Sequence, residues 1–328
     1  MTTGSDSTCP LPPLVAHLSK RVDELRQYVP KAIRGGDVGA IHQARVTTRR
    51  LKAALDLLEP ILPDAPRKRF ARTLRRLRRT LGPSRDVDVM LGHLPDLRPR
   101  REGPCDAIDW LARSLTARRD ELARDRAKTV KISQILRELD AWEPLARRVA
   151  GGQDRARALL VSAAPRLLGE FAEQSTRVAA LDLEKSCEAA EDVHALRVSG
   201  KIVRYMLELA EPAGIELPRR VLPKFKRLQD ALGLWHDYAA LGEQVLRFAV
   251  RDELGLHRPA LYGEVLKLAR ASWRKSNAHL RAFGRTWTRD GAALVQSIRQ
   301  ALAPDVPQVD VQPLSDVPVN EEVASATP

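Results

Sequence analysis

Apolar residues recur at every third or fourth position along most of the chain, which is the period of one buried face of an α-helix. The first run extends from Val15 to Val29, and a later one extends from Phe70 to Leu81. The same period continues through the last long segment, from about residue 259 to residue 302. The pattern therefore predicts an all-α protein whose helices pack through aliphatic seams.

Capping residues, glycines and prolines predict where these helices begin and end. Asp37 is expected to cap the second helix, and Gly82–Pro83 is expected to end the third. Ser84 then has the residue type of an N-cap for a fourth helix. We also expect Pro165 to break a later helix and a new helix to begin after Leu234.

A row of basic residues occurs twice. The segment 41–52 reads IHQARVTTRRLK, and the spacing of one histidine and three cations recurs from residue 194 onward. On a helix each row covers an arc of about 80° and a length of about 15 Å, long enough for several successive anionic groups but too extended to grip one ion. The two rows are His42, Arg45, Arg49, Lys52 and His194, Arg197, Lys201, Arg204.

The repeat continues beyond these rows. Residues 74–88 align with residues 225–239, which pairs Gly82 with Gly233 and Asp86 with Asp237. The two acids are expected to orient neighbouring arginines. The chain is thus predicted to be a tandem duplication of halves of roughly 150 residues, the usual size of a domain. We expect a disordered leader (1–12), a first helical bundle (13–150), a second helical bundle (153–303) and a disordered acidic tail (304–328).

Net charge indicates the class of partner. The chain carries a formal charge of +13, and its last 25 residues hold five acids and no lysine or arginine, so the predicted helical part is more basic still. Such a field attracts phosphates, nucleic acids or anionic surfaces. Arginine suits bidentate phosphate contacts, although a GC-rich genome, which encodes arginine in place of lysine, would produce much of the same bias. The positions of the cations, not their number, therefore have to identify the ligand.

The sequence contains none of the common catalytic or cofactor signatures. HExxH, GxSxG, Walker-A and glycine-rich dinucleotide motifs are all missing, so we predict no enzyme and no cofactor. The cations three and seven residues after His42 and His194 disfavour a divalent metal. The three cysteines form no CxxC pair, and no apolar run has the length of a membrane span. We expect a cytoplasmic protein that does not enter a membrane.

Four segments in this order, HxxRxxxRRLK, LRRLxxxLGxxRDxD, HxxRxxxKxxRY and LQDxLGxxxD, resemble the two halves of a CHAD domain, a family named for its conserved histidine and α-helical fold. The resemblance covers nearly all of the chain outside its ends. It implies two pseudo-symmetric antiparallel helical bundles that bind inorganic polyphosphate on a basic central surface. The acid–base motif ExExK of the enzyme domain often fused to CHAD domains is missing, so the chain is similar to the stand-alone, non-catalytic type.

The predicted ligand is accordingly inorganic polyphosphate, with targeting to polyphosphate granules or recruitment of a polyphosphate-metabolising enzyme as further expectations. A nucleic-acid-binding protein remains the alternative, disfavoured because the basic helices hold almost no aromatic residues on which bases could stack. A metal-binding or regulatory partner of a phosphate-metabolising enzyme is a third hypothesis. The predicted binding residues are His42, Arg45, Arg49, Arg50, Lys52, Arg72, Arg75, Arg76, Arg79, His194, Arg197, Lys201, Arg204, Lys224 and Arg227.

Overall fold

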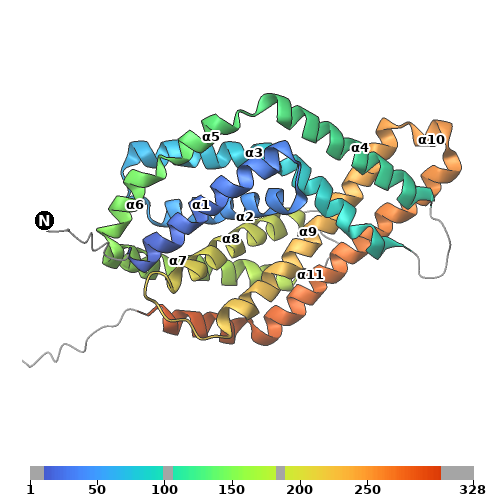
Figure 1. The fold of residues 1–328 in the computed structure, drawn as a ribbon. Coiled ribbons are helices and arrows are strands. Elements are labelled where there is room, and N and C mark those ends of the chain that lie inside the picture. The colour runs from blue at the N-terminus through green and yellow to red at the C-terminus, as the bar shows by residue number, and fades with distance from the viewer. Residues whose placement is uncertain (1–10, 99–105, 182–188, 304–328) are drawn as a thin grey trace, which may run out of the picture.

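The computed structural model describes residues 11–98, 106–181 and 189–303, and within these ranges every regular element is a helix (Figure 1). The all-α prediction is confirmed. The elements are α1 (Pro13–Arg34), α2 (Val38–Leu57), η1 (Glu59–Ile61), α3 (Asp64–His93), η2 (Pro95–Leu97), α4 (Asp106–Thr129), α5 (Ile132–Leu139), α6 (Trp142–Ala150), α7 (Gln153–Ala179), α8 (Ala189–Ala210), α9 (Val221–Arg251), α10 (Leu254–His257) and α11 (Pro259–Ala301).

Several predictions concern residues outside the described ranges. The acidic tail and most of the leader lie there, as do the three cysteines Cys9, Cys105 and Cys187. Among the described helices, none combines the length and the hydrophobicity required to cross a bilayer.

Three predicted helix breaks are wrong. Helix α3 continues through Gly82 and Pro83, α7 continues through Pro165, and α9 runs past Leu234 without interruption. A proline inside a helix removes one hydrogen bond. In α3 the apolar seam continues on both sides of Pro83, from Leu81 to Val87, so burial of that seam against neighbouring helices offsets the lost bond.

The continuity of α3 also changes the role of the residues after Pro83. Ser84 is buried inside the helix and accepts a hydrogen bond from Arg126 of α4, so it is not an N-cap. Asp86 and Asp88 lie inside α3, in its C-terminal third, and not in the first turn of a separate helix. Asp37, by contrast, caps α2 as predicted, since its carboxylate accepts from the backbone N–H of Ala40 at 2.6 Å.

In the described part of the chain the hydrophobic core has two clusters, and each contains residues from both halves of the sequence. The larger extends from Leu14 of α1 to Leu302, just after α11. The smaller joins residues of α3 and α4 to residues of α9, α10 and α11. Helix α6 ends just before Gly151–Gly152 and α7 begins just after it. The division into two pseudo-symmetric bundles at this point stays a prediction.

Helices α2 and α8, which carry the two basic rows, pack against each other near the middle of the molecule (Figure 1). The side of α2 that is opposite its basic row is buried in the core through Leu51 and Leu55. Helix α3 packs on α2, and α9 packs on α8. This arrangement brings cations from both halves of the sequence to one place.

Candidate functional site

Four cations from the two predicted rows approach one another across the contact between α2 and α8. We call Arg45 and Arg49 of α2 with Arg197 and Lys201 of α8 the central cluster. Burial, together with the charges of Arg197 and Arg49, lowers the pKa of Lys201 to about 7. Arg49 therefore interacts electrostatically with both Arg197 and Lys201 of α8. The basic rows of the two halves converge in this part of the fold.

Helix α3 fixes the position of Arg45. Its Nη1 atom donates to the backbone oxygen of Arg78 at 3.3 Å, and its Nη2 atom lies 3.5 Å from Asp86 Oδ1. A Cβ atom on Gly82 would lie 2.7 Å from Arg45 Nη1, closer than real Cβ contacts allow. Glycine at position 82 thus leaves the space that the guanidinium occupies.

Asp86 and Asp237 are the acids closest to the central cluster in electrostatic terms. Asp86 of α3 interacts with Arg45, Arg49 and Arg197, and also with Asp237 of α9. Asp237 interacts in turn with Arg197 and Lys201. Their positions agree with the sequence-based expectation that they orient arginines. They lie where α3 and α9 meet the central cluster and line a pocket of about 350 Å³ together with His236.

The histidines that begin the two rows lie at the edges of the cluster. Burial and the charges of Arg85, Arg49 and Arg45 lower the pKa of His42. Its Nδ1 atom is buried and has no hydrogen-bond partner among the described residues. His194 is exposed, and its ring lies 6.4 Å from that of His236, measured between centroids.

Part of the central cluster's hydrogen-bonding capacity is not satisfied among the described residues. The Nε atoms of Arg45 and Arg197 are buried without a partner in the described part of the chain. Burial lowers the pKa of both guanidinium groups, and Arg49 lowers it further in each case. Because like charges held together and partly desolvated raise the free energy of the free protein, an anion bound here would relieve the repulsion.

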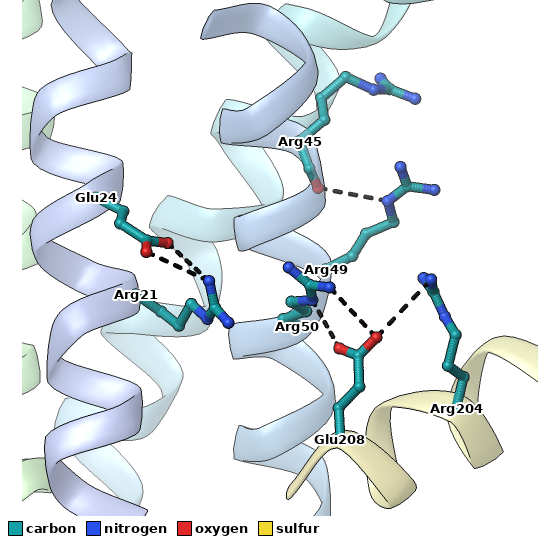
Figure 2. A network of polar contacts seen from close by, with 7 residues as sticks. All are labelled: Arg21, Glu24, Arg45, Arg49, Arg50, Arg204 and Glu208. Carbon is teal, nitrogen blue, oxygen red and sulfur yellow. Dashed lines mark hydrogen bonds and ion pairs between the residues drawn. The ribbon is translucent and has the colours of Figure 1, made fainter. Parts of the chain in front are cut away.

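The later members of the two rows are paired with acids. Glu208 of α8 accepts two hydrogen bonds from Arg50 and lies 3.8 Å from Arg204 Nη1 (Figure 2). Lys52 pairs with Asp56 one turn further along α2. In Figure 2, Arg45 and Arg49 leave the same side of α2, and Arg49 Nε donates to the backbone oxygen of Arg45 at 3.3 Å. Within the described part of the chain, the cations of the two rows that have no acid within ion-pairing distance are therefore Arg49, Arg197 and Lys201, whereas Arg45 pairs with Asp86.

The remaining predicted residues do not all reach the central cluster. Arg75 and Arg79 are exposed and share the face of α3 that carries Gly82 and Asp86, so they extend the cluster along α3. Arg72 and Arg76 line a different pocket, next to α5. Two further cations, Lys224 and Arg227 of α9, interact instead with Asp290 of α11.

Three residues of the site were not predicted from the sequence. Arg78 and Arg85 interact electrostatically with Arg45, and His236 interacts with Arg197 and Lys201. Burial and these cations lower the pKa of His236 to about 4. The signal that could have identified the two arginines is their seven-residue spacing, which places them on one face of α3 only if that helix continues through Pro83.

The chemistry of the cluster is that of an anion-binding site. Guanidinium and ammonium groups donate hydrogen bonds to phosphate or carboxylate oxygens, and arginine does so in pairs. Among the described residues, no three histidine, aspartate or glutamate side chains are grouped so that they could hold a metal ion.

Comparison with known proteins identifies the fold. No curated protein matches the chain. A solved structure, described as the crystal structure of the CHAD domain from the plant Ricinus communis, matches with a TM-score of 0.57 at 20% sequence identity, covering 92% of this chain and 94% of that one. The family model of the CHAD domain matches residues 16–246, well over half of the chain. The protein belongs to the CHAD domain family.

Proposed function

We propose that this protein binds inorganic polyphosphate at the central cluster, without catalysing a reaction on it. The observation that carries this proposal is the convergence of Arg49 with Arg197 and Lys201, which come from different halves of the sequence. Partly buried cations that repel one another, and whose donors lack partners, favour binding of a multivalent anion. The membership of the CHAD family supports the same ligand.

A polymer fits the surface better than a single phosphate. Each row extends over about 15 Å along its helix, and Arg75 and Arg79 continue the exposed cations along α3. A chain of linked phosphates places a negative charge on every unit, so one molecule can contact several of these cations in succession. Binding of this kind is expected to be strongly salt-dependent, because each contact releases condensed counterions.

Duplex nucleic acid is the alternative ligand, because it also presents a series of phosphates. A competition experiment separates the two. The protein is first saturated with fluorescent duplex DNA at about 0.15 M salt, and long-chain polyphosphate is then added at matched phosphate concentration. We expect polyphosphate to displace the DNA, and displacement of bound polyphosphate by DNA in the reverse titration would contradict the proposal.

The biological setting follows from the ligand. A non-catalytic polyphosphate-binding protein in the cytoplasm would associate with polyphosphate granules or bring a polyphosphate-metabolising enzyme to its substrate. Colocalisation of a fluorescently labelled protein with granules, compared with an Arg49→Gln variant, tests the first setting. Equal granule association of the two proteins would contradict it.

A further inference from the structure

The face of α3 that packs toward α5 carries a pocket of its own. The pocket measures about 350 Å³ and is lined by Arg69, Arg72, Thr73 and Arg76 of α3 and by Glu138 of α5. We call it the outer pocket. It shares no lining residue with the central cluster, and nothing in the proposed function requires it.

A carboxylate already occupies the outer pocket. Glu138 Oε2 accepts a hydrogen bond from Thr73 Oγ1 at 2.8 Å and lies 2.9 Å from Arg76 Nη2. The other carboxylate oxygen, Oε1, accepts from Gln134 Nε2 at 3.1 Å. A hydroxyl and a guanidinium that converge on one anionic oxygen are also the donors with which proteins bind phosphate oxygens.

The charge of the outer pocket is not balanced by this carboxylate. Three guanidinium groups face one glutamate, and only Arg76 pairs with it. Arg69 and Arg72 have no carboxylate within ion-pairing distance in the described part of the chain, and both side chains are exposed. The Nε atom of Arg72 donates only to the backbone oxygen of Lys68, at 3.4 Å. Two positive charges thus remain available to an incoming anion.

We propose that the outer pocket is a second phosphate-binding site. In the free protein the Glu138 carboxylate occupies the position in which a phosphate group of the ligand binds. A phosphate group carrying two negative charges would pair with Arg69, Arg72 and Arg76 and accept the Thr73 hydrogen bond. It would displace the singly charged Glu138 carboxylate, which is 20% exposed and can turn toward solvent. The identity of the ligand as inorganic phosphate polymer rests on the proposed function, but the existence of the site does not.

The geometry favours a short or terminal phosphate segment at this site. Thr73 is 2% exposed, and its hydroxyl donates to the Glu138 carboxylate within the pocket, so a compact tetrahedral group in place of that carboxylate would accept the same hydrogen bond. The arginines around it can bind such a group bidentately. The competing glutamate makes the outer pocket weaker than the central cluster, and removal of its charge is expected to strengthen binding.

Isothermal titration with inorganic tripolyphosphate tests this proposal. The wild-type protein is expected to show two binding events, the weaker of which is lost in Arg69→Gln/Arg72→Gln. In Glu138→Gln, which keeps the size of the side chain and its acceptor oxygen for Thr73, the weaker event should strengthen several-fold. A single event in the wild type, or unchanged affinity of the weaker event in Glu138→Gln, would overturn the proposal.

An Arg49→Gln variant distinguishes this result from a failure of the proposed function. It should weaken only the stronger event, because Arg49 belongs to the central cluster. If Arg49→Gln has no effect while Glu138→Gln strengthens binding, the proposed function fails and the outer pocket stands. If Arg49→Gln weakens the only event observed, the outer pocket fails and the proposed function stands. Far-UV circular dichroism of each variant confirms that the helices are retained.

Discussion

Glu208 of α8 accepts hydrogen bonds from two atoms of Arg50 of α2, Nε at 2.6 Å and Nη2 at 3.2 Å (Figure 2). The pair joins the two halves of the sequence at the side of the central cluster, and both side chains are largely shielded, at 28% and 22% exposure. The same glutamate lies near Arg204. Arg50 thus joins α2 to α8 through Glu208, whereas Arg49, one residue earlier, belongs to the central cluster, where we propose that the ligand binds.

Removal of the Glu208 charge should therefore destabilise the fold more than it alters binding. We expect Glu208→Gln to lower the free energy of unfolding by about 1–3 kcal/mol, because Arg50 loses a charge-assisted, bidentate partner. Urea denaturation measures this change. A double-mutant cycle with Arg50→Gln should give a coupling energy of about 1 kcal/mol, and additive effects of the two substitutions would contradict the bridging role.

Gly82→Ala should separate stability from binding. Alanine is favoured over glycine in a helix interior by about 0.5–1 kcal/mol, and the Cβ would meet only the flexible end of Arg45. We expect unchanged or slightly higher stability together with a several-fold loss of polyphosphate affinity, because the Arg45 guanidinium is displaced.

Gly233→Ala is the matched control for this substitution. Gly233 is the counterpart of Gly82 in the second half of the sequence, lies inside α9, and a Cβ there would have no atom within 4 Å. The Gly233→Ala protein should gain a similar amount of stability, and its affinity for polyphosphate should not change. Equal affinities of the two alanine variants would show that Arg45 does not contact the ligand. Thermal unfolding and fluorescence titration supply both quantities.

The helical period of the sequence was sufficient to predict the all-α fold and the helix faces that carry the four cations of the central cluster. Arg45, Arg49, Arg197 and Lys201 could be assigned to two helix faces because those faces depend only on local geometry. Their convergence depends on the long-range packing of α2 against α8, and local periodicity does not predict which helices pack together. A resemblance to CHAD domains was needed to expect it.

The errors in prediction have local and long-range causes. Pro83 was expected to end a helix, but α3 continues because its apolar seam is buried on both sides of the proline. Because of that expectation Arg85 was not predicted as a site residue, although the continuous helix places it near Arg45. Pairing of Arg76 with Glu138 could not be predicted, because the two residues are 62 positions apart and meet only through the packing of α5 on α3.

Polyphosphate binding should be coupled to proton uptake by Lys201. Burial and the neighbouring cations Arg197, Arg49 and Arg204 lower its pKa to about 7, with Asp237 of α9 opposing them. Above pH 7 the free protein therefore holds Lys201 mostly neutral, and a bound polyanion would raise the pKa again. Affinity should rise as the pH falls from 8 to 7, by at most about tenfold per pH unit for one proton.

Isothermal titration at pH 8 in buffers of different ionisation enthalpy measures this uptake, and long chains keep the contribution of terminal phosphates small. We expect uptake of up to about one proton per bound segment in the wild type and almost none in Lys201→Arg, which stays charged. Titration of His236 should not interfere, because its pKa of about 4 lies below this range. Uptake that persists in Lys201→Arg would assign the proton to another group.

The same pKa has a consequence for stability. Because the pKa of Lys201 is lower in the folded protein than in the unfolded chain, the unfolded chain binds more protons between about pH 7 and pH 10. The free energy of unfolding should therefore rise with pH across this window, and Lys201→Met should reduce the slope. An unchanged slope in urea denaturation at pH 7.5 and pH 9 would contradict this assignment.

The central claim, that cations of both halves form one polyanion site, is tested most directly by the salt dependence of long-chain polyphosphate affinity in Arg49→Gln and Arg197→Gln. Arg155→Gln, which removes an exposed arginine from the first turn of α7, is the control for net charge. Each of the two cluster variants should weaken binding about tenfold and reduce the slope of log K against log salt by about one, whereas the control should change neither beyond about twofold. Equal behaviour of all three variants would contradict the claim.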